Sequence, residues 1–525
     1  MSSSPTKLRP LSAAAVKAML GDGKELALID VREELIYSRN HLLWARSVPL
    51  SRLALQFARL VPRRSTRIVL CDDGDGLVER AAAILAGAGY SDLSSLEGGI
   101  AAWERAGFIL FSGMNVPSKA FGEFIEHQRG TPSISADELD EWMREGRDIA
   151  ILDSRPFDEF SRISIPRGIN VPGAELVLRA RDMAPSPDTM IVVNCAGRTR
   201  SIMGAQSLID AGVPNKVVAL RNGTMGWHLA GLACANGASA RYPDVSTQGL
   251  AWSQEAAQRV AEKAGVRIID RAALQALRAD TTRTTYVFDV RDPQDYARGH
   301  FPGAVSAPGG QLIQATDTYV GTLHARVVLC DDRKVRALMT AAWLRQMGWD
   351  EVFVLPEAGE ETDAPKVEIL GTPNMDAAID AEELAAQKDA TVLDLSRSPN
   401  YAKGHFPGAW FAIAGRLDRA LAKIPLRSTL VLTSEDDVLA SLTVEEARVL
   451  TKAPVRWLKG GNAAWVAAGH ALSRDPLMGD EPVDAWLKPY ERAGDPKNAM
   501  NEYLAWEVDL LERIKQDGTC NFLGA

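Results

Sequence analysis

The sequence predicts an α/β fold built from four tandem copies of one domain, each with a central, mostly parallel sheet flanked by helices. The first observation is an internal repeat, in which each copy spans roughly 100 residues, the size of an independent domain. The second is that short apolar strands alternate with helical patterns, as over residues 77–89 and 335–348. This alternation is typical of α/β units around a parallel sheet. The length of 525 residues agrees, because it exceeds one ordinary domain.

Three landmarks define the repeat. An apolar strand ends in an acidic residue, a second strand leads to a cysteine or threonine 39 to 42 residues later, and a Gly-rich turn closes on a tryptophan. The aspartates are Asp30, Asp153, Asp289 and Asp394, and the second strand leads to Cys71, Cys195, Cys330 and Thr433. The tryptophans Trp103, Trp227 and Trp465 each follow that position by 32 residues, whereas the third copy keeps a shortened turn at Leu355–Gly359 without tryptophan.

The spacing of the landmarks predicts the domain organisation. The copies are expected at residues 8–112 (copy one), 132–235 (copy two), 263–357 (copy three) and 373–475 (copy four), with a C-terminal helical extension over 476–525. Residues 113–131 are expected to form a connecting helix and residues 357–373, acidic with Pro and Gly, a linker. The connector over 236–262 crosses the middle of the chain and suggests two pairs of copies. Apolar spacing over 502–511 predicts a helix that docks on a domain through its aromatic residues.

Composition limits the class of protein. The net charge of −9 argues against a general nucleic-acid binder, which normally has a basic surface. No apolar run reaches the roughly 18 residues of a membrane span, and the N-terminus has no apolar signal region. Five widely spaced cysteines fit reduced thiols in the cytoplasm better than a disulfide framework, and no cluster has the spacing of a metal site.

The segment Asn194–Ser201 combines the features of a reactive site. An apolar, β-branched strand over 190–193 precedes it and a helical pattern over 202–209 follows it, so Cys195 should begin a tight loop before a helix. Loop N–H groups at a helix N-terminus favour an anion. Two arginines within five residues add positive charge, and a thiol in such a setting ionises more readily than an ordinary one. The candidate residues are Cys195 as the nucleophile and Ala196, Gly197, Arg198, Thr199, Arg200 and Ser201 as the substrate-binding loop. The alternative, a buried structural cysteine, does not account for the arginines.

The other three copies lack this pattern. Copy one follows Cys71 with Asp72 and Asp73, and copy three follows Cys330 with two aspartates. Carboxylates beside a thiol raise its pKa and repel an anionic donor. Copy four has Thr433 instead of a cysteine and is expected to be inactive.

Two further features have competing interpretations. Gly-His-Phe-Pro-Gly-Ala occurs at 299–304 and 404–409, and its histidine could be catalytic or could form a local hydrogen bond in a turn. The second interpretation is favoured, because copy two has the best cysteine loop and lacks this histidine. Lys119 could face the anion site, but a solvated lysine is the favoured interpretation.

Together, the aspartate-ended strand, the Gly-His-x-Pro-Gly-Ala turn, the strand leading to the cysteine loop and the Gly-Gly-x-x-x-Trp segment resemble the rhodanese family of sulfurtransferases. The resemblance covers about four fifths of the chain as four tandem rhodanese-like domains. It implies that Cys195 is the nucleophile and that the Cys-x-x-x-x-Arg loop ending at Arg200 has sulfurtransferase length. Related phosphatase and arsenate reductase members use a loop one residue longer, which the segment Cys330–Arg336 formally matches.

The resemblance implies thiosulfate sulfurtransferase activity, in which Cys195 takes sulfane sulfur from thiosulfate or a persulfide and passes it to cyanide or a thiol. We expect no metal or organic cofactor, no nucleic-acid partner and no membrane association, and the sequence leaves the oligomeric state open. Two alternatives remain: an oxyanion enzyme of the phosphatase or arsenate reductase type, and a non-catalytic scaffold that binds a partner through its four domains.

Overall fold

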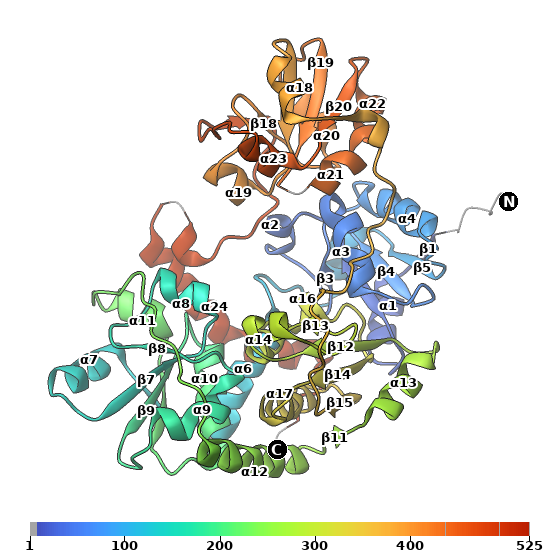
Figure 1. The fold of residues 1–525 in the computed structure, drawn as a ribbon. Coiled ribbons are helices and arrows are strands. Elements are labelled where there is room, and N and C mark those ends of the chain that lie inside the picture. Colours follow the sequence, from blue (N-terminus) through green and yellow to red (C-terminus); the bar gives the residue numbers. More distant parts are fainter. Residues whose placement is uncertain (1–7, 436, 493, 524–525) are drawn as a thin grey trace. The chain divides into compact units, whose positions relative to one another are not determined.

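The computed structural model describes residues 8–435, 437–492 and 494–523. Copies one and two each contain five strands and five helices (Figure 1). Copy one is formed by β1 (Arg9–Leu11), α1 (Ala13–Leu20), β2 (Ala27–Asp30), α2 (Glu34–Tyr37), β3 (Arg46–Ser47), α3 (Leu53–Leu60), β4 (Ile68–Cys71), α4 (Leu77–Gly87), β5 (Leu93–Leu96) and α5 (Gly99–Arg105). Copy two is formed by β6 (Ser133–Ile134), α7 (Ala136–Arg144), β7 (Ile149–Asp153), α8 (Phe157–Arg162), β8 (Ile169–Asn170), α9 (Glu175–Met183), β9 (Met190–Asn194), α10 (Thr199–Ala211), β10 (Val217–Leu220) and α11 (Gly223–Leu229).

Copies three and four repeat this arrangement with local changes. Copy three is formed by β11 (Arg267–Ile268), α13 (Arg271–Ala279), β12 (Thr285–Asp289), α14 (Pro293–Arg298), β13 (Val305–Ser306), α15 (Gly309–Gln314), α16 (Thr316–Tyr319), β14 (Arg326–Cys330), α17 (Val335–Gln346) and β15 (Val352–Leu355). Copy four is formed by β16 (Ala378–Ile379), α18 (Ala381–Ala386), β17 (Ala390–Asp394), α19 (Ser398–Lys403), β18 (Trp410–Phe411), α20 (Leu417–Leu421), β19 (Thr429–Thr433), α21 (Asp437–Leu442), α22 (Val444–Leu450), β20 (Val455–Leu458), α23 (Gly461–Ala467) and β21 (Leu477–Met478). Further helices are α6 (Val116–Arg129), α12 (Thr247–Lys263) and α24 (Pro496–Asp517), and short 3-10 turns lie at Leu50–Arg52, Met375–Ala377 and Pro489–Glu491.

All four sheets have the same strand order. The order in copy one is β1-β5-β4-β2-β3, and each later copy repeats it with its own strands. Every pairing between these strands is parallel, as between β7 and β9 and between β9 and β10. Parallel strands need crossover connections, which the intervening helices supply, and their burial on both faces explains the continuous apolar runs. The predicted α/β class with four copies is therefore confirmed.

The fourth sheet extends beyond the predicted end of its domain. β21 pairs in parallel with β18 and adds a sixth strand. The predicted boundary at residue 475 follows the last sequence landmark, and a two-residue strand leaves too little pattern to detect beyond it.

The repeated landmarks have structural roles. In copy two, the buried carboxylate of Asp153 accepts hydrogen bonds from the Arg155 guanidinium at 2.7 and 2.8 Å. The histidines of the Gly-His-Phe-Pro-Gly-Ala turns are fully buried, and each stacks on a tyrosine, with His300 on Tyr296 at 3.9 Å between ring centroids. The Nδ1 atom of His300 lies 3.1 Å from the Tyr296 carbonyl oxygen. The local, structural interpretation of these histidines is confirmed.

The chain divides into two compact units. Among the described residues, one unit contains copies one and four, in residues 8–18, 26–113, 367–435 and 437–486, and the other contains copies two and three, mainly in residues 114–366, 487–492 and 494–523. The suggestion of two pairs is correct, but residues 236–262 do not separate them: α12 lies inside the second unit and packs on α9 and α17. The predicted linker at 357–373 does contain a boundary between units, at residue 366.

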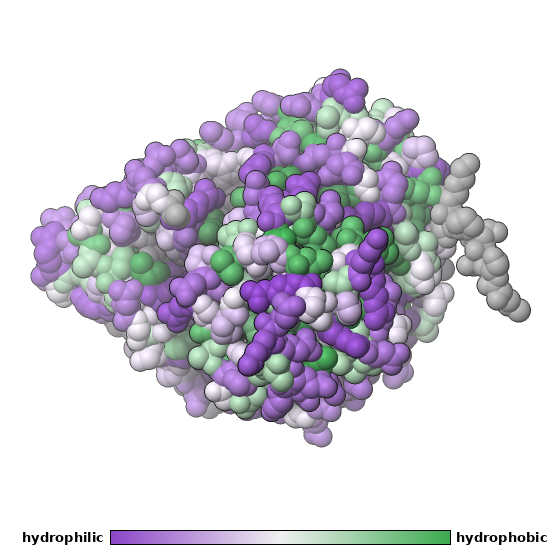
Figure 2. Space-filling view, turned by 90° about the horizontal axis from the view of Figure 1, so that it is seen from above, coloured by the Kyte–Doolittle hydropathy of each residue, from purple (hydrophilic) through white to green (hydrophobic). Residues whose placement is uncertain are grey.

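The predicted connecting helix over 113–131 is α6, and the helix predicted over 502–511 is part of α24. The two helices lie against each other in the second unit (Figure 1). No helix in the described part of the chain is long and apolar enough to cross a membrane. Figure 2 shows polar residues over most of the visible face, with apolar residues in smaller patches between them.

Candidate active site

Cys195 lies where a central strand meets a helix. It follows β9 directly, and α10 begins four residues later at Thr199. Ligands of parallel α/β sheets bind outside the carboxyl ends of the strands, which is the position of this loop. The neighbouring side chain of Asn194 donates hydrogen bonds to Asp153 at 2.8 Å and to Thr224 at 3.1 Å, so the strand end is fixed on both sides.

The start of α11 orients the peptide groups of the loop. The N–H of Thr224 donates to the Cys195 carbonyl at 2.8 Å, and the N–H of Met225 donates to the Ala196 carbonyl at 2.9 Å. The Thr224 hydroxyl adds a third hydrogen bond to the Cys195 carbonyl, at 3.1 Å. Because α11 binds these carbonyl oxygens, the loop N–H groups can point to the side of the loop that faces away from α11.

The N–H groups from Ala196 to Arg200 accordingly have no acceptor among the residues that the structure describes. The thiol of Cys195 donates weakly to the Ser201 hydroxyl at 3.5 Å, and that hydroxyl donates to the Arg198 carbonyl at 2.8 Å. Unpaired N–H groups at a helix N-terminus are a ready site for an anion. The loop therefore places a sulfur atom beside unfilled hydrogen-bond donors.

The corresponding loops of copies one and three are filled by their own aspartates. Asp331, the residue after Cys330, accepts hydrogen bonds from the N–H groups of Arg333 at 3.2 Å and Arg336 at 2.8 Å. In copy one, Asp72 accepts from the N–H groups of Gly74 at 2.8 Å and Val78 at 3.0 Å. Copy two has Ala196 at this position, which has no side-chain acceptor. The residue after the cysteine thus decides whether the loop is open.

Copy four also fills its loop without an anion. Thr433 donates to the Asn462 side chain at 3.1 Å, and the Ser434 hydroxyl accepts from the N–H of Ala440 at 3.4 Å.

In copy three, the arginine of the longer Cys-x5-Arg pattern is already paired with carboxylates. The Arg336 side chain is 1% exposed and pairs with Asp331 at 2.8 Å, with Asp332 at 3.2 Å and with Glu175. This geometry gives no support to oxyanion chemistry at Cys330.

The other loop cysteines are buried and weakly acidic. Burial raises the pKa of the Cys330 thiol far above its usual value, and the charge of Asp289 raises it further. The pKa of Cys71 is raised for the same reasons, with Asp30 in the place of Asp289. The neighbouring aspartates named by the sequence contribute in the same direction, but burial is the larger cause.

Both predicted arginines are next to the loop, and both are paired with carboxylates. Arg198 donates to Glu123 at 2.7 Å through two nitrogens and also contacts Glu126, both on α6. Arg200, 8% exposed, donates to Glu159 on α8 at 3.0 Å and to the Gln311 side chain at 3.1 Å.

This environment keeps the Arg200 side chain protonated. Burial lowers the pKa of Arg200, but the carboxylate of Glu159 and a thiolate at Cys195 raise it by more, so the net shift is upward. Arg200 is therefore the guanidinium whose charge is coupled to that of the sulfur.

The favoured interpretation of Lys119 as a solvated side chain is wrong. Lys119 is 8% exposed, and its ammonium lies 3.0 Å from Glu507 of α24. Glu507 is fully buried and also accepts from the Tyr503 hydroxyl at 3.1 Å and the Thr199 hydroxyl at 3.5 Å. Lys119 does face the loop, because α24 and α6 pack together over the start of α10.

The C-terminal segment covers the Cys195 loop. Ala196 and Met225 form an apolar cluster with Met500 and Leu504 of α24. Lys488, just before α24, pairs with Glu159 at 3.1 Å, so it shares that carboxylate with Arg200. Cys195 is only 2% exposed under this cover. The predicted docking of the C-terminal helix is confirmed.

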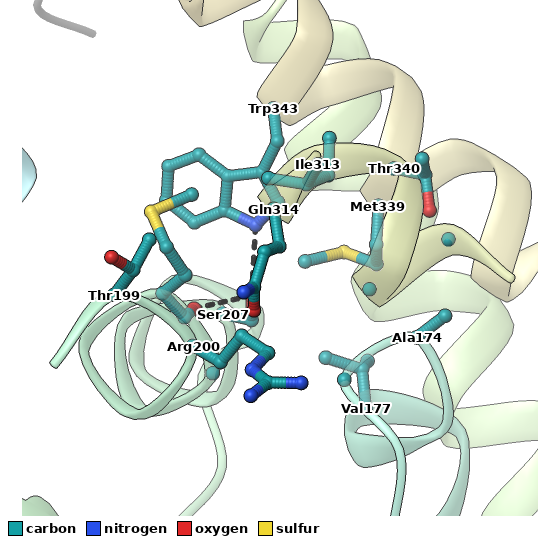
Figure 3. Close-up of a pocket in the computed structure, with 15 residues that line it drawn as sticks. Ala174, Val177, Thr199, Arg200, Ser207, Ile313, Gln314, Met339, Thr340 and Trp343 are labelled. Carbon is teal, nitrogen blue, oxygen red and sulfur yellow. Dashed lines mark hydrogen bonds between the residues drawn. The ribbon is translucent and has the colours of Figure 1, made fainter. Parts of the chain in front are cut away.

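A cavity lies on the other side of α10, between copies two and three (Figure 3). Its lining is largely apolar and includes Val177, Met203 and Met339, and Trp343 donates to the Ser207 hydroxyl at 2.8 Å across it. Arg200 lines its edge, whereas Cys195 does not line it. The cavity therefore does not provide direct access to the sulfur.

Sequence reasoning located the loop and missed its carboxylate partners. Glu123, Glu126 and Glu159 are distant from the loop in sequence, and Glu507 is 308 residues from its partner Thr199. A weak signal existed in α6, where Lys119, Glu123 and Glu126 follow one another at spacings of four and three and so share a face. Nothing in the sequence connected this face with α24.

Comparisons with known proteins agree with this geometry. The family model described as "Rhodanese-like domain" matches residues 12–106, 135–230 and 270–359. Copy four lies outside these matches, although its sheet has the same strand order. A 101-residue stretch is 32% identical to the HTH-type transcriptional regulator Rv0324 of Mycobacterium tuberculosis, covering 19% of this chain and 44% of that protein's length.

Among solved structures, a thiosulfate sulfurtransferase from Pseudomonas aeruginosa is 44% identical, with a TM-score of 0.95. The match covers 98% of this chain and 99% of that one. The Alr3790 protein from Anabaena sp. is 28% identical over 20% of this chain and 84% of its own, with a TM-score of 0.19. The family matches, the repeated sheet and the cysteine loop lead to one assignment. The chain belongs to the rhodanese family and consists of four tandem rhodanese-like domains.

Proposed function

We propose that this rhodanese-type transferase moves sulfane sulfur from an anionic donor, thiosulfate or a low-molecular-weight persulfide, to cyanide or a thiol through a persulfide on Cys195. The observation that carries the proposal is the contrast between Ala196 and Asp331. Only in copy two does a cysteine begin a loop whose N–H groups are not already bound to a carboxylate of the same loop.

The first half-reaction forms the persulfide. The Cys195 thiolate attacks the outer sulfur of thiosulfate, a new S–S bond forms, and the bond between that sulfur and the sulfonate breaks. The bonding electrons leave with sulfite, and the enzyme keeps a cysteine persulfide anion. The N–H groups from Ala196 to Arg200 would stabilise this negative charge, and Arg200 would attract the donor.

The second half-reaction restores the thiolate. A nucleophile, cyanide or a thiolate, attacks the outer sulfur of the persulfide, and the electrons of the broken S–S bond return to Cys195. The product is thiocyanate or a new persulfide. Such a two-step, covalent scheme has ping-pong kinetics. No step consumes an oxidant or reductant, because the sulfur atom carries its oxidation state from donor to acceptor.

The protein's setting is part of the same proposal. None of the five cysteines forms a disulfide, which fits a reduced, cytoplasmic environment. Intact-protein mass spectrometry after incubation with thiosulfate tests the function directly. We expect a gain of one sulfur atom on Cys195, removed by cyanide. Loss of that gain in Cys195→Ser, with the gain retained in Cys330→Ser, supports the assignment, and the opposite pattern refutes it.

A further inference from the structure

The strongest unexplained feature of the site is the second carboxylate oxygen of Glu507. The side chain is fully buried and its Oε1 atom accepts from Lys119 and Tyr503, but Oε2 has no hydrogen-bond partner among the described residues. Leaving a buried, charged oxygen unpaired is costly, so it requires a reason. This oxygen lies 3.2 Å from the position that a Cβ atom on Gly197 would take. It therefore lies directly against the loop that begins at Cys195.

The other copies show what a carboxylate does at such a loop. In copies one and three, Asp72 and Asp331 supply a carboxylate to the loop N–H groups. Copy two has no such residue, but a carboxylate from a distant helix reaches the outer face of the same loop. The difference is that Asp72 and Asp331 belong to their loops, whereas Glu507 belongs to α24, a helix outside the four domains.

We propose that Glu507 is a built-in anion that competes with anionic donors for the Cys195 loop and so sets the preference of the site among donors. This inference rests on the proposed function of Cys195. An anionic donor that enters the loop meets the negative charge of Glu507, and it finds Lys119 already paired with that carboxylate. A donor with less charge meets no such opposition.

A displacement of α24 would change the charge balance of the site. Arg198 and Arg200 keep their carboxylate partners, because Glu123 and Glu159 belong to α6 and α8. Lys119 loses the carboxylate that pairs with it, since Glu507 moves with the helix. The same motion also separates Met500 and Leu504 from Ala196. A displacement of α24 would therefore remove one negative charge, free one positive charge and uncover Ala196 together.

The test compares two alkylating reagents of similar size, iodoacetamide, which is neutral, and iodoacetate, which is anionic. The rate of modification of Cys195 is followed by peptide mass spectrometry in the full-length wild-type protein and in Glu507→Gln. We expect the ratio of the iodoacetate rate to the iodoacetamide rate to rise about tenfold in the variant, the size of effect expected for removing one buried charge near the Cys195 loop. Cys234, which is partly exposed, reports the reagents' intrinsic ratio in the same sample.

Glu502→Gln is the matched control. It removes one carboxylate from an exposed position on the same helix, where Glu502 accepts a hydrogen bond from the Asn498 side chain at 2.7 Å. We expect no change in the ratio. Thiosulfate kinetics give a second measurement: KM for thiosulfate should fall in Glu507→Gln, with a smaller change for a persulfide whose remaining part is uncharged.

The outcomes separate electrostatic competition from simple covering. If both reagents react faster in Glu507→Gln by the same factor, the residue only holds α24 closed and the proposal is wrong. If neither rate changes, the proposal is also wrong. If that variant does not fold, Lys119→Met replaces it, because removing the cation while keeping the carboxylate should lower the ratio. Since labelling needs no turnover, a wild-type protein that forms no persulfide would refute the proposed function without deciding the role of Glu507.

Discussion

Gly223 lies so close to Cys195 that a Cβ atom on the glycine would come within 2.4 Å of the cysteine's carbonyl oxygen. The glycine also has φ of +54°, a conformation that side chains other than hydrogen disfavour. The close approach lets the first N–H groups of α11 reach the loop carbonyls. The orientation of the loop therefore requires a residue without a Cβ atom at position 223.

Gly223→Ala is therefore expected to reduce sulfur transfer strongly by shifting the loop away from α11. Gly212→Ala is the control, because Gly212 also has positive φ, +76°, but has no atom within 4 Å of the added carbon. The control should lose about 1 kcal/mol of stability from backbone strain and keep its activity. If both variants lose the same activity, backbone strain alone explains the effect of Gly223→Ala. Persulfide formation and thermal unfolding, measured together, distinguish the two effects.

The choice among the cysteines can be tested by single substitutions. We expect Cys195→Ser to abolish thiosulfate:cyanide sulfur transfer, and Cys71→Ser and Cys330→Ser to retain most of it. The reason is that Asp72 and Asp331 occupy the loops of the other two cysteines and burial raises the pKa of both thiols. Steady-state rates of thiocyanate formation measure this. An inactive Cys330→Ser together with an active Cys195→Ser would assign the reaction to copy three.

The roles of the arginines can be separated by the charge of the donor. We expect Arg200→Ala to weaken the use of thiosulfate by about ten- to a hundredfold in kcat/KM, the cost of losing a charge-assisted hydrogen bond. The loss should be smaller for a persulfide donor whose remaining part is uncharged. Arg198→Ala should act in the same direction but less, because two carboxylates of α6 hold that guanidinium. Equal losses with both donors would indicate a collapsed loop.

Most of the candidate loop could be predicted from the sequence because its determinants are local. The strand before Cys195, the two arginines, Ser201 and the glycine turn at Gly223 all lie between residues 190 and 223. The parallel sheet and its helical cover follow from local alternation of strands and helices for the same reason, whereas the order of the strands in the sheet was not predicted. The sequence also indicated that Asp331 disfavours chemistry at Cys330, although it did not reveal that the carboxylate accepts the loop N–H groups.

The remaining parts of the site depend on contacts between distant segments. Lys119 has the sequence character of a solvated residue, and only the packing of α24 on α6 buries it beside Glu507. The grouping of copies one and four likewise depends on packing between surfaces, to which the length of a connector is a poor guide. Periodicity identifies which face of a helix is apolar, but it does not identify the surface that the face covers.

Glu33 gives a prediction for the other unit of the chain. Its carboxyl group is 6% exposed and accepts from the Ser51 hydroxyl at 3.0 Å. Burial raises its pKa to about 7, and the nearby charge of Asp484 adds to the shift. The folded state therefore holds this proton more tightly than the unfolded state, whose pKa is about 4.3.

The sign of the pH effect follows from this difference. Glu33 does not lower the stability of the fold below pH 4, and the stability falls as the pH rises from about 4 to 7, by about 4 kcal/mol in total. Glu33→Gln should remove this loss, so that its thermal midpoint exceeds that of the wild type at pH 8 but not at pH 5. A variant that is less stable than the wild type at pH 8 would contradict the prediction. The transition to compare is that of the unit containing copies one and four, because the whole chain is not expected to unfold in two states.

The long sequence separation between Thr199 and Glu507 also has a consequence for the order in which the protein is made. The N-terminal part of a chain emerges from the ribosome first, and domains fold as they emerge. The Cys195 loop is complete 308 residues before its carboxylate cover exists. During that interval Lys119 has no Glu507 to pair with and Ala196 lacks the contacts of Met500 and Leu504, and synthesis of α24 ends this state. A ribosome stalled between the two segments would therefore hold a form of the enzyme with donor preferences that the finished protein lacks.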